Sequence, residues 1–451
     1  MVRRKIILIA VALFYRAVTV IVAQNPICPP GVYIPDPSAR VWNDGKLYVY
    51  GSLIQKNGND PNKFGGVGYQ WALSSSDLIH WEITRDIIAS VGPDDQIHYN
   101  DAPFWAPDCM YKDGMYYLYY CQPYPEMPEG VATSKSPVGP FTNAKPIYLK
   151  GYNQIDPAVF IDDDGQAYYL WGQFSAKIAK LKPNMTEIDT TTINPVVLNE
   201  KQHFFHEGVC MIKRKGVYYL VYTDISRKGR ATCIGYATSK SPMGPYQYGG
   251  VIVDNDGCDP NTWNNHGSVV EFNNQWYVFY HRATNGSVSM RKTCIEPISF
   301  DEDGSIPEVE MTSQGAGKPL NAFSKIEAEQ TCLMFGNVRI ESREKENDQL
   351  AKITDNDNAA YKYIDFGKGA ESIRIRVAPG KNQGKITFKP DNLWEPPIGA
   401  IEIPGGGDGK TWTTLSCDLK RTEGIHLFIM VFNTTDHEAD SFGIDWFTFN
   451  N

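Results

Sequence analysis

DGKLYVYG (44–51) is the first of five variants of one pattern, and the others are DGMYYLYY (113–120), DGQAYYLW (164–171), KGVYYLVY (215–222) and NNQWYVFY (273–280). Each variant begins with a two-residue turn and continues with aromatic and aliphatic residues, which is typical of a β-hairpin. Their starts are 69, 51, 51 and 58 residues apart, and a four-stranded propeller blade needs about 40–50 residues. The repeat therefore predicts an all-β chain whose residues 24–310 form a five-bladed β-propeller.

The position eight residues before each turn is the second informative feature. The residues found there are Asp36, Trp105, Asp156, Glu207 and Asn265, and His266 follows the last of them. The innermost strands of a propeller line its central channel, so equivalent positions in successive blades surround one axis. An alternative is that these acids only begin turns, because Asp-Pro pairs favour turn initiation. Three acids in the same phase favour a shared site instead.

The sequence around the three acids is apolar: VYIPDPSARV, YNQIDPAVFI and HFFHEGVCMI. Burial beside apolar groups raises the pKa of a carboxyl and suits one of the three to general-acid work. Glycoside hydrolysis needs such a pair, with one protonated acid for the leaving oxygen and one ionised carboxylate as base or nucleophile. A third acid can orient the other two.

Four segments resemble the motifs of glycoside hydrolase family 43. They are PDPSARVWNDGKLYVYGS, WAPDCMYKDGMYYLYY, IDPAVFIDDDGQAYYLWG and HEGVCMIKRKGVYYLVYT, in the order that the family has them. The resemblance implies a five-bladed propeller enzyme that acts on plant glycans containing arabinose, xylose or galactose. It also implies hydrolysis with inversion at the anomeric carbon and no cofactor for catalysis.

The same resemblance implies roles for individual residues. Asp36 would be the general base that activates water, and Glu207 the general acid. Asp156 would hold Glu207 in place and raise its pKa. Trp105 of the WAP motif would form a wall of the sugar pocket, and Arg291 matches a late arginine that contacts the sugar.

His266 matches a histidine that lines the channel and that in relatives lies near a central ion or water. Each of the binding residues has an alternative explanation from the residues alone. Trp105 could pack in the core between sheets, His266 could be an ordinary interior histidine, and Arg291 could pair with Glu296. The run DDDG (162–165) lacks the remaining ligands of a calcium loop and is interpreted as a solvated turn.

Composition narrows the class of protein. The 451 residues have a net charge of −9 and a pI near 5.5, which argue against nucleic acid or an anionic membrane surface as a partner. Aromatic residues make up 12% of the chain, and their rings can stack on sugars. The nine cysteines include no C-x-x-C pair, so no metal cluster is indicated and buried thiols are expected at Cys121, Cys210 and Cys233.

The N-terminus has a basic start, an apolar run and small residues before position 24. Residues 1–23 are therefore predicted to be a secretory signal peptide cleaved after Ala23, which makes the protein secreted or periplasmic. Arg16 interrupts the apolar run, so no stable membrane span is expected. Retention as an uncleaved anchor is the alternative.

Composition changes after residue 310. Residues 311–324 are small and polar and predict a linker, and residues 325–451 show short alternating strands typical of a β-sandwich. The ends of this segment resemble a family 6 carbohydrate-binding module, a jelly-roll. That resemblance implies a structural calcium held by Glu327, Glu329 and Asp445, and carboxylates suit such a cation. The alternative is that these acids are solubilising charges at strand edges.

One position departs from that family's pattern. Gly443 stands where the sugar-binding cleft has an asparagine, two residues before Asp445. Tyr361 and Trp394 could still offer stacking faces. We therefore predict a module that keeps its fold and binds sugar weakly or differently.

The leading functional hypothesis is an exo-acting glycosidase that releases α-L-arabinofuranosyl or β-D-xylosyl units from plant polysaccharides or oligosaccharides. An alternative within the family is a galactan- or galactofuranose-directed hydrolase. A non-catalytic glycan-binding propeller belongs to a different class, and the presence of all three acids argues against it.

Overall fold

The computed structural model describes residues 18–22, 24–56, 64–123, 129–259, 262–344, 347–435 and 441–451. Strands dominate this part of the chain, where the only α-helix is α1 (Glu200–His203) and two short 3-10 turns are η1 (Thr190–Thr192) and η2 (Ala328–Gln330). The predicted all-β fold class is confirmed. Of the predicted signal peptide, residues 1–17 and 23 lie outside the described residues, and residues 18–22 form strand β1. No helix in the described ranges is long and apolar enough to cross a membrane.

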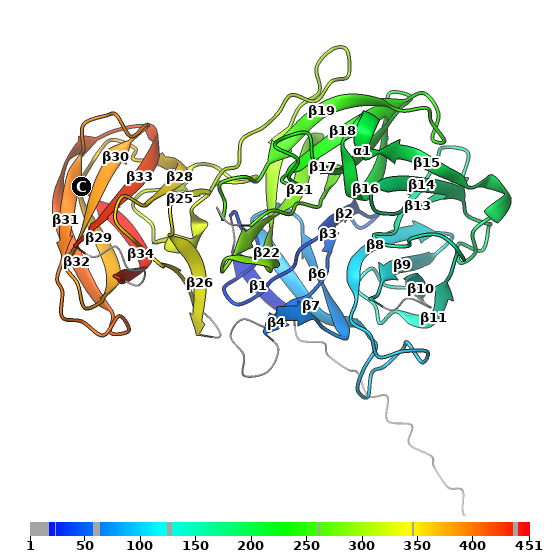
Figure 1. Cartoon of the computed structure of the whole chain (residues 1–451), viewed down its shortest axis with the longest axis horizontal. Helices are drawn as coiled ribbons and strands as arrows, with labels where there is room; N and C mark the ends of the chain where they lie inside the picture. Colours follow the sequence, from blue (N-terminus) through cyan, green and yellow to red (C-terminus); the bar gives the residue numbers. More distant parts are fainter. Residues whose placement is uncertain are drawn as a thin grey trace, which may run out of the picture.

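Five antiparallel sheets follow one another along the first two thirds of the chain (Figure 1). The first sheet has the order β1 (Val18–Val22), β7 (His80–Ala89), β6 (Tyr69–Ser75), β3 (Leu47–Tyr50) and β2 (Ser38–Val41). The second has the order β11 (Thr142–Ile147), β10 (Glu129–Ser134), β9 (Met115–Cys121) and β8 (Trp105–Lys112). The third has the order β12 (Ala158–Ile161), β13 (Ala167–Trp171), β14 (Ser175–Lys180) and β15 (Asn194–Asn199).

The remaining two sheets repeat this arrangement. The fourth has the order β16 (Phe205–Arg214), β17 (Val217–Asp224), β18 (Cys233–Ser239) and β19 (Gln247–Asp254). The fifth has the order β20 (Ser268–Phe272), β21 (Gln275–Thr284) and β22 (Ser287–Ile298). A small hairpin of β4 (Ile54–Lys56) and β5 (Phe64–Gly66) extends the loop after β3.

The five sheets close into a ring, which we call the five-sheet ring. One edge strand of each sheet contacts an edge strand of the next, from β2 through β8, β12 and β16 to β20, and β20 contacts β2 again. Asn25 fastens the seam: its amide donates to the carbonyl of Ile295 at 2.9 Å, and its side-chain oxygen accepts from the Ile295 N–H at 2.8 Å. Residues at the start of these five strands therefore surround one axis.

The repeated hairpins explain why the sheets pack against one another. The last aromatic residue of each repeat is completely buried between sheets: Tyr50, Tyr120, Trp171, Tyr222 and Tyr280. Burying a side chain of this size contributes about 2 kcal/mol. Eight of the nine cysteines are also buried as free thiols, which confirms the prediction for Cys121, Cys210 and Cys233.

The C-terminal part is a sandwich of two sheets, which we call the C-terminal sandwich. One sheet has the order β23 (Leu320–Asn321), β28 (Asn358–Asp365), β33 (Ile425–Thr434), β30 (Gly384–Pro390) and β31 (Gly399–Ile403), with β25 (Leu333–Phe335) beside β28. The other has the order β26 (Arg339–Glu344), β27 (Asn347–Ala351), β34 (Phe442–Asn450), β29 (Ala370–Pro379) and β32 (Thr413–Thr422), with β24 (Ile326–Glu327) beside β34.

Tyr361 lies in the core of this sandwich, so its prediction as a sugar-stacking face is wrong. Its ring packs edge-on against Phe447 with 4.9 Å between centroids, and its hydroxyl donates to the carbonyl of Ala328 at 2.9 Å. Trp394, the other candidate, is 93% exposed. Tyr361 belongs to strand β28, whereas Trp394 lies in the loop between β30 and β31.

The predicted linker, residues 311–324, is hydrogen-bonded to both parts of the chain. Thr312 donates from its N–H and its hydroxyl to Glu296 in the five-sheet ring, each at 2.7 Å. The Ser313 N–H donates to the carbonyl of Lys362 in the C-terminal sandwich at 2.6 Å. The ring and the sandwich are therefore packed together at this segment.

Glu129 makes stability depend on pH. It is completely buried in β10, accepts hydrogen bonds from Gln154 at 2.6 Å and Tyr169 at 3.0 Å, and burial raises its pKa to about 8. Its folded pKa exceeds its unfolded pKa, so the folded state prefers the protonated form and loses stability as the pH rises from about 4.5 to about 8. Because glutamine does not titrate, Glu129→Gln should reduce this pH-dependent loss in the free energy of unfolding by up to about 4 kcal/mol.

Urea unfolding of both proteins at pH 5 and pH 8 measures the effect. The wild type should lose more stability than Glu129→Gln between the two pH values. An equal loss in the two proteins would show that Glu129 titrates normally in the folded state.

Candidate active site

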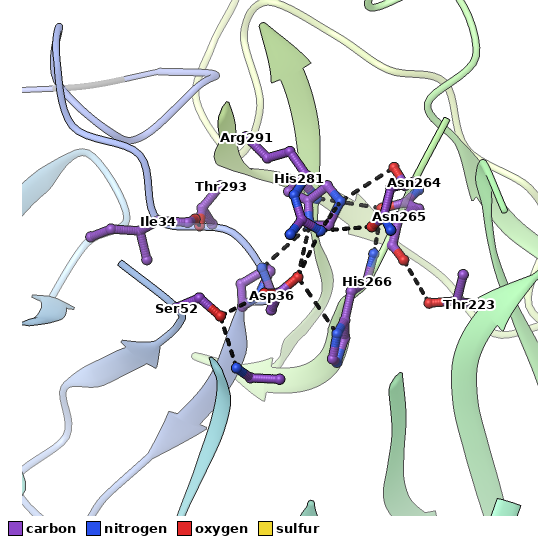
Figure 2. A network of polar contacts seen from close by, with 12 residues as sticks. Ile34, Asp36, Ser52, Thr223, Asn264, Asn265, His266, His281, Arg291 and Thr293 are labelled. Atoms are coloured by element: carbon purple, nitrogen blue, oxygen red, sulfur yellow. Dashed lines mark hydrogen bonds and ion pairs between the residues drawn. The ribbon is translucent and has the colours of Figure 1, made fainter. Parts of the chain in front are cut away.

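Asp36 lies at the centre of a polar network on the axis of the five-sheet ring (Figure 2). Its Oδ1 is 2.9 Å from Nη1 of Arg291, and its Oδ2 accepts from the hydroxyl of Ser52 at 2.6 Å. Its N–H donates to Nδ1 of His281 at 3.2 Å. Nε2 of the same imidazole lies 3.2 Å from the carbonyl of Asn264 and 3.2 Å from Nη1 of Arg291. Both carboxylate oxygens are thus held by donors from other strands.

The network decides the charge of Asp36. Burial raises its pKa, but Arg291 first, then His266 and His281 and the hydroxyl of Ser52, lower it to about 2. The apolar sequence context predicted a raised pKa, and for this acid the prediction is wrong because Arg291 and the polar groups around it, which come from distant segments of the chain, outweigh burial. Asp36 is therefore an ionised carboxylate across the whole range in which a glycosidase works.

Asp156 has the opposite electrostatic environment. Burial, and next the negative charges of Glu207, Asp36 and Glu129, raise its pKa well above its usual range, against the opposing charge of Arg291. Sγ of Cys121 is 3.9 Å from its Oδ1. Here the predicted rise in pKa agrees with the structure. Asp156 therefore favours its protonated form, whereas Asp36 is ionised.

Glu207 is held by two side-chain amides. Nε2 of Gln173 donates to its Oε2 at 2.7 Å, and Nδ2 of Asn264 lies 3.4 Å from its Oε1. Asn264 also accepts from Nη1 of Arg291 at 2.6 Å through its own side-chain oxygen. Asn264 thus links Glu207 to Arg291 and, through Arg291, to Asp36.

Asp36 and Asp156 share an unusual backbone conformation. Their φ angles are 59° and 56°, in the left-handed region, and a proline follows each. Asp and Asn tolerate this region better than other residues with a side chain. The conformation directs both side chains from strand starts toward the axis, and it limits which residues can replace them without strain.

His266 approaches Asp36 from the loop before β20, with its Nδ1 3.6 Å from Oδ1 (Figure 2). Burial lowers its pKa. Gly208 makes room for the ring, because a Cβ at that position would lie 2.7 Å from Cδ2 of His266. The structure therefore places His266 beside Asp36.

Arg291 and Trp105 complete the predicted set. Arg291 pairs with Asp36, and Glu296, the alternative partner, pairs with Arg282 at 3.1 Å instead. Trp105 begins β8, and its carbonyl accepts from Sγ of Cys121 at 3.4 Å. Sγ of Cys121 also contacts Asp156, so this thiol lies between Trp105 and Asp156.

Comparison with known proteins places this arrangement in a family. The profile of the family described as "Glycosyl hydrolases family 43" matches residues 23–306. The chain belongs to glycosyl hydrolase family 43. It is therefore a glycosyl hydrolase, and the profile of "Carbohydrate binding module (family 6)" matches residues 327–451.

Relatives of this family 43 enzyme match over most of their length. A "Xylosidase/arabinosidase" of Thermoclostridium stercorarium is 31% identical, over 85% of this chain and 94% of that protein. An "Arabinoxylan arabinofuranohydrolase" of Bacillus subtilis is 29% identical, over 92% of this chain and 90% of that protein. A solved arabinoxylan arabinofuranohydrolase from Bacillus subtilis, in complex with cellotetraose, has a TM-score of 0.57 at 26% identity and covers 95% of this chain and 98% of that one.

Five contacts of the family 43 site were missed from the sequence, although a signal exists for four of them. These four residues lie near the end of the second strand of a repeated hairpin or just after it: Ser52, Cys121, Gln173 and His281. Each follows the last aromatic residue of its repeat by one or two positions. The second strand of a hairpin ends beside the start of the first, so this phase also reaches the axis. Asn264 has no comparable signal, because it lies in an irregular loop.

The predicted calcium ligands Glu327, Glu329 and Asp445 line one pocket of about 390 Å³. In this structure Lys325 pairs with Glu327, and Nη1 of Arg376 is 3.0 Å from Asp445. No group of three metal-ligating side chains is close enough to hold an ion among the residues that the structure describes.

Glu329 nevertheless fits a cation. Its Oε2 is buried without a hydrogen-bond partner, and burial raises its pKa to about 8. Three carboxylates around one pocket are the donor type that a hard cation prefers.

Proposed function

We propose that this enzyme is an inverting, exo-acting glycosidase that releases α-L-arabinofuranosyl or β-D-xylosyl units from plant polysaccharides or oligosaccharides. The observation that carries the proposal is the contrast between two buried carboxyls near the axis: the pKa of Asp36 is lowered to about 2, whereas the pKa of Asp156 is raised well above its usual range. An inverting mechanism requires an ionised base and a protonated acid at the same time. The names of the relatives from Thermoclostridium stercorarium and Bacillus subtilis support the sugar class.

In the proposed reaction Asp36 acts on a water molecule. The carboxylate takes a proton from the water while the water oxygen bonds to the anomeric carbon, and Glu207 gives its proton to the glycosidic oxygen as that bond breaks. Arg291 and Ser52 hold the two oxygens of Asp36, which fixes its direction without protonating it. Asp156 would hold Glu207 in place for this proton transfer.

The sugar would lie on the axis of the five-sheet ring, and we propose that the five sheets are the five blades of a propeller. Trp105 would form one wall of the pocket, and Arg291 and His266 would contact the bound sugar. These three residues come from two different sheets and the loop between strands, so they can enclose a sugar from separate directions.

Aryl glycosides test the proposal. Release of 4-nitrophenol from arabinofuranoside, xyloside, galactoside and galactofuranoside substrates should occur with the first or second of them, and proton NMR of the first product should show the inverted anomer. Hydrolysis of only galactose derivatives would favour a galactan- or galactofuranose-directed enzyme. A product with retained configuration would exclude Asp36 as a general base.

We further propose that residues 1–23 are removed on secretion, which leaves the protein outside the cytoplasm or in the periplasm. The basic start and apolar run of the N-terminus support this. N-terminal sequencing of the natively produced protein tests it, and a first residue of Gln24 is the expected result.

We also propose that Glu327, Glu329 and Asp445 bind calcium. The ion would be structural, because it would join carboxylates from the beginning and the end of the C-terminal sandwich. Calcium should raise the melting temperature of the wild type, and chelation should lower it. Glu329→Gln should abolish this difference. Equal melting temperatures of the wild type with calcium and with chelator would contradict the site.

A further inference from the structure

Strand β22 joins the active site to the C-terminal sandwich through two consecutive residues. Arg291 points to one side of the strand and pairs with Asp36. Lys292 points to the other side, because successive side chains of a strand alternate. Its ammonium pairs with Asp348 of β27 in the C-terminal sandwich, and both side chains are at most 1% exposed. Figure 1 shows β26, the neighbour of β27, on the side of the sandwich nearest to β22.

Asp348 also holds the segment that leads to Asp36. Its carboxylate accepts from the N–H of Gly31 at 3.4 Å and from the hydroxyl of Ser342, which in turn contacts the hydroxyl of Tyr33. Lys292 donates to the carbonyl of Pro29 at 2.9 Å. The segment 29–36 and β22 therefore meet the sandwich at one buried ion pair.

A second ion pair involves Asp259, five positions before Asn264 in the sequence. Nε of Arg339 in β26 is 3.0 Å from Asp259, and the same carboxylate accepts from the N–H of Gly286 at 2.8 Å. The N–H of Asn285 donates to the carbonyl of Ile340 at 2.8 Å. The sandwich thus contacts three separate segments of the five-sheet ring, and each of them leads to a residue of the Asp36 network.

We propose that the C-terminal sandwich is a structural part of the active site and that Asp348 is a positioning residue, which aligns β22 with segment 29–36 so that Arg291 meets Asp36. The inference rests on the proposed function, since it takes Asp36 as the general base. A buried ion pair adds little net stability but tolerates few alternative arrangements, because an unpaired buried charge is very costly. Such a contact can therefore fix the relative position of two segments.

The sharpest test replaces Asp348 by Asn, which keeps the shape of the side chain and removes its charge. The matched control is Glu310→Gln: Glu310 also joins the ring to the sandwich, through Lys362 at 3.1 Å and Tyr363 at 2.8 Å, but in a segment without active-site residues. Amide hydrogen exchange of residues 29–36 and 285–293 is measured on both full-length variants. Steady-state kinetics are measured at a temperature well below unfolding.

Asp348→Asn should speed exchange in both segments and lower kcat about tenfold with little change in KM, because a small misplacement of catalytic groups reduces turnover more than binding. Glu310→Gln should change neither quantity. If Asp348→Asn only lowers the melting temperature, with wild-type kcat and wild-type exchange, Asp348 is merely structural and the inference is wrong.

Two further arms keep the test decisive. If Asp348→Asn does not fold, Ser342→Ala removes the bridging hydroxyl without a change of charge and is measured in the same way. If the wild type hydrolyses no glycoside, the proposed function fails, whereas the exchange measurement still decides whether Asp348 aligns the two segments.

Discussion

Asp36→Asn is expected to lower kcat by about 10²–10⁴-fold, the range that general acid–base catalysis contributes. Asn keeps the size of the side chain and tolerates the left-handed backbone, with φ of 59° at this position. It can still meet Ser52, but it cannot take a proton from water. KM should change little, and the measurement is steady-state kinetics on the aryl glycoside that the wild type cleaves best.

The matched control is Asp86→Asn. Asp86 has the same left-handed conformation, with φ of 52°, but it is exposed on the outer strand β7 and accepts from Nε1 of Trp71 at 3.1 Å. This variant should have wild-type kcat. Activity of Asp36→Asn within tenfold of the wild type would refute the role of Asp36 as base.

Glu207→Gln is expected to show an effect that depends on the leaving group. On xylo- or arabino-oligosaccharides, whose leaving oxygen needs a proton, kcat should fall by about 10³-fold. On 4-nitrophenyl glycosides the loss should be far smaller, because nitrophenolate leaves without protonation. Gln keeps the shape that Gln173 and Asn264 contact, so the two substrates isolate the proton.

Glu200→Gln serves as the control for this variant. Glu200 lies in α1 and contacts Nδ1 of His206, the neighbour of Glu207, at 3.0 Å, so it undergoes the same substitution in the same region. It should leave both activities unchanged. Equal losses on activated and unactivated substrates for Glu207→Gln would mean that Glu207 does not act as the acid.

The repeats predicted the architecture well because they encode local structure. A turn followed by alternating aromatic residues specifies a hairpin without help from the rest of the chain, and all five repeats form the first hairpin of a sheet. The position eight residues before each turn also placed the three carboxylates near the starts of strands. It did not predict how the sandwich packs on the ring, because contacts such as Lys292 with Asp348 join residues that share no repeat and no motif.

The electrostatics of the site were only partly predictable. Asp156 has the raised pKa that its apolar neighbours suggest, since other carboxylates add to the effect of burial. Asp36 has an equally apolar sequence context, yet Arg291, 255 positions later in the chain, reverses the direction. Local sequence reports burial, whereas the sign of a pKa shift depends on charges that only the fold brings near.

The seam at Asn25 has a consequence for the order in which the chain folds. Its side chain bonds Ile295 in β22, which is 270 residues away in the chain. Blades made early in synthesis can form their own hairpins, but the circle stays open until β22 has been made, because contacts of such long range form late. Nascent chains that stop before residue 298 should therefore expose the unpaired faces of the first and last sheets, and chaperones that bind apolar surface are needed longest at this stage.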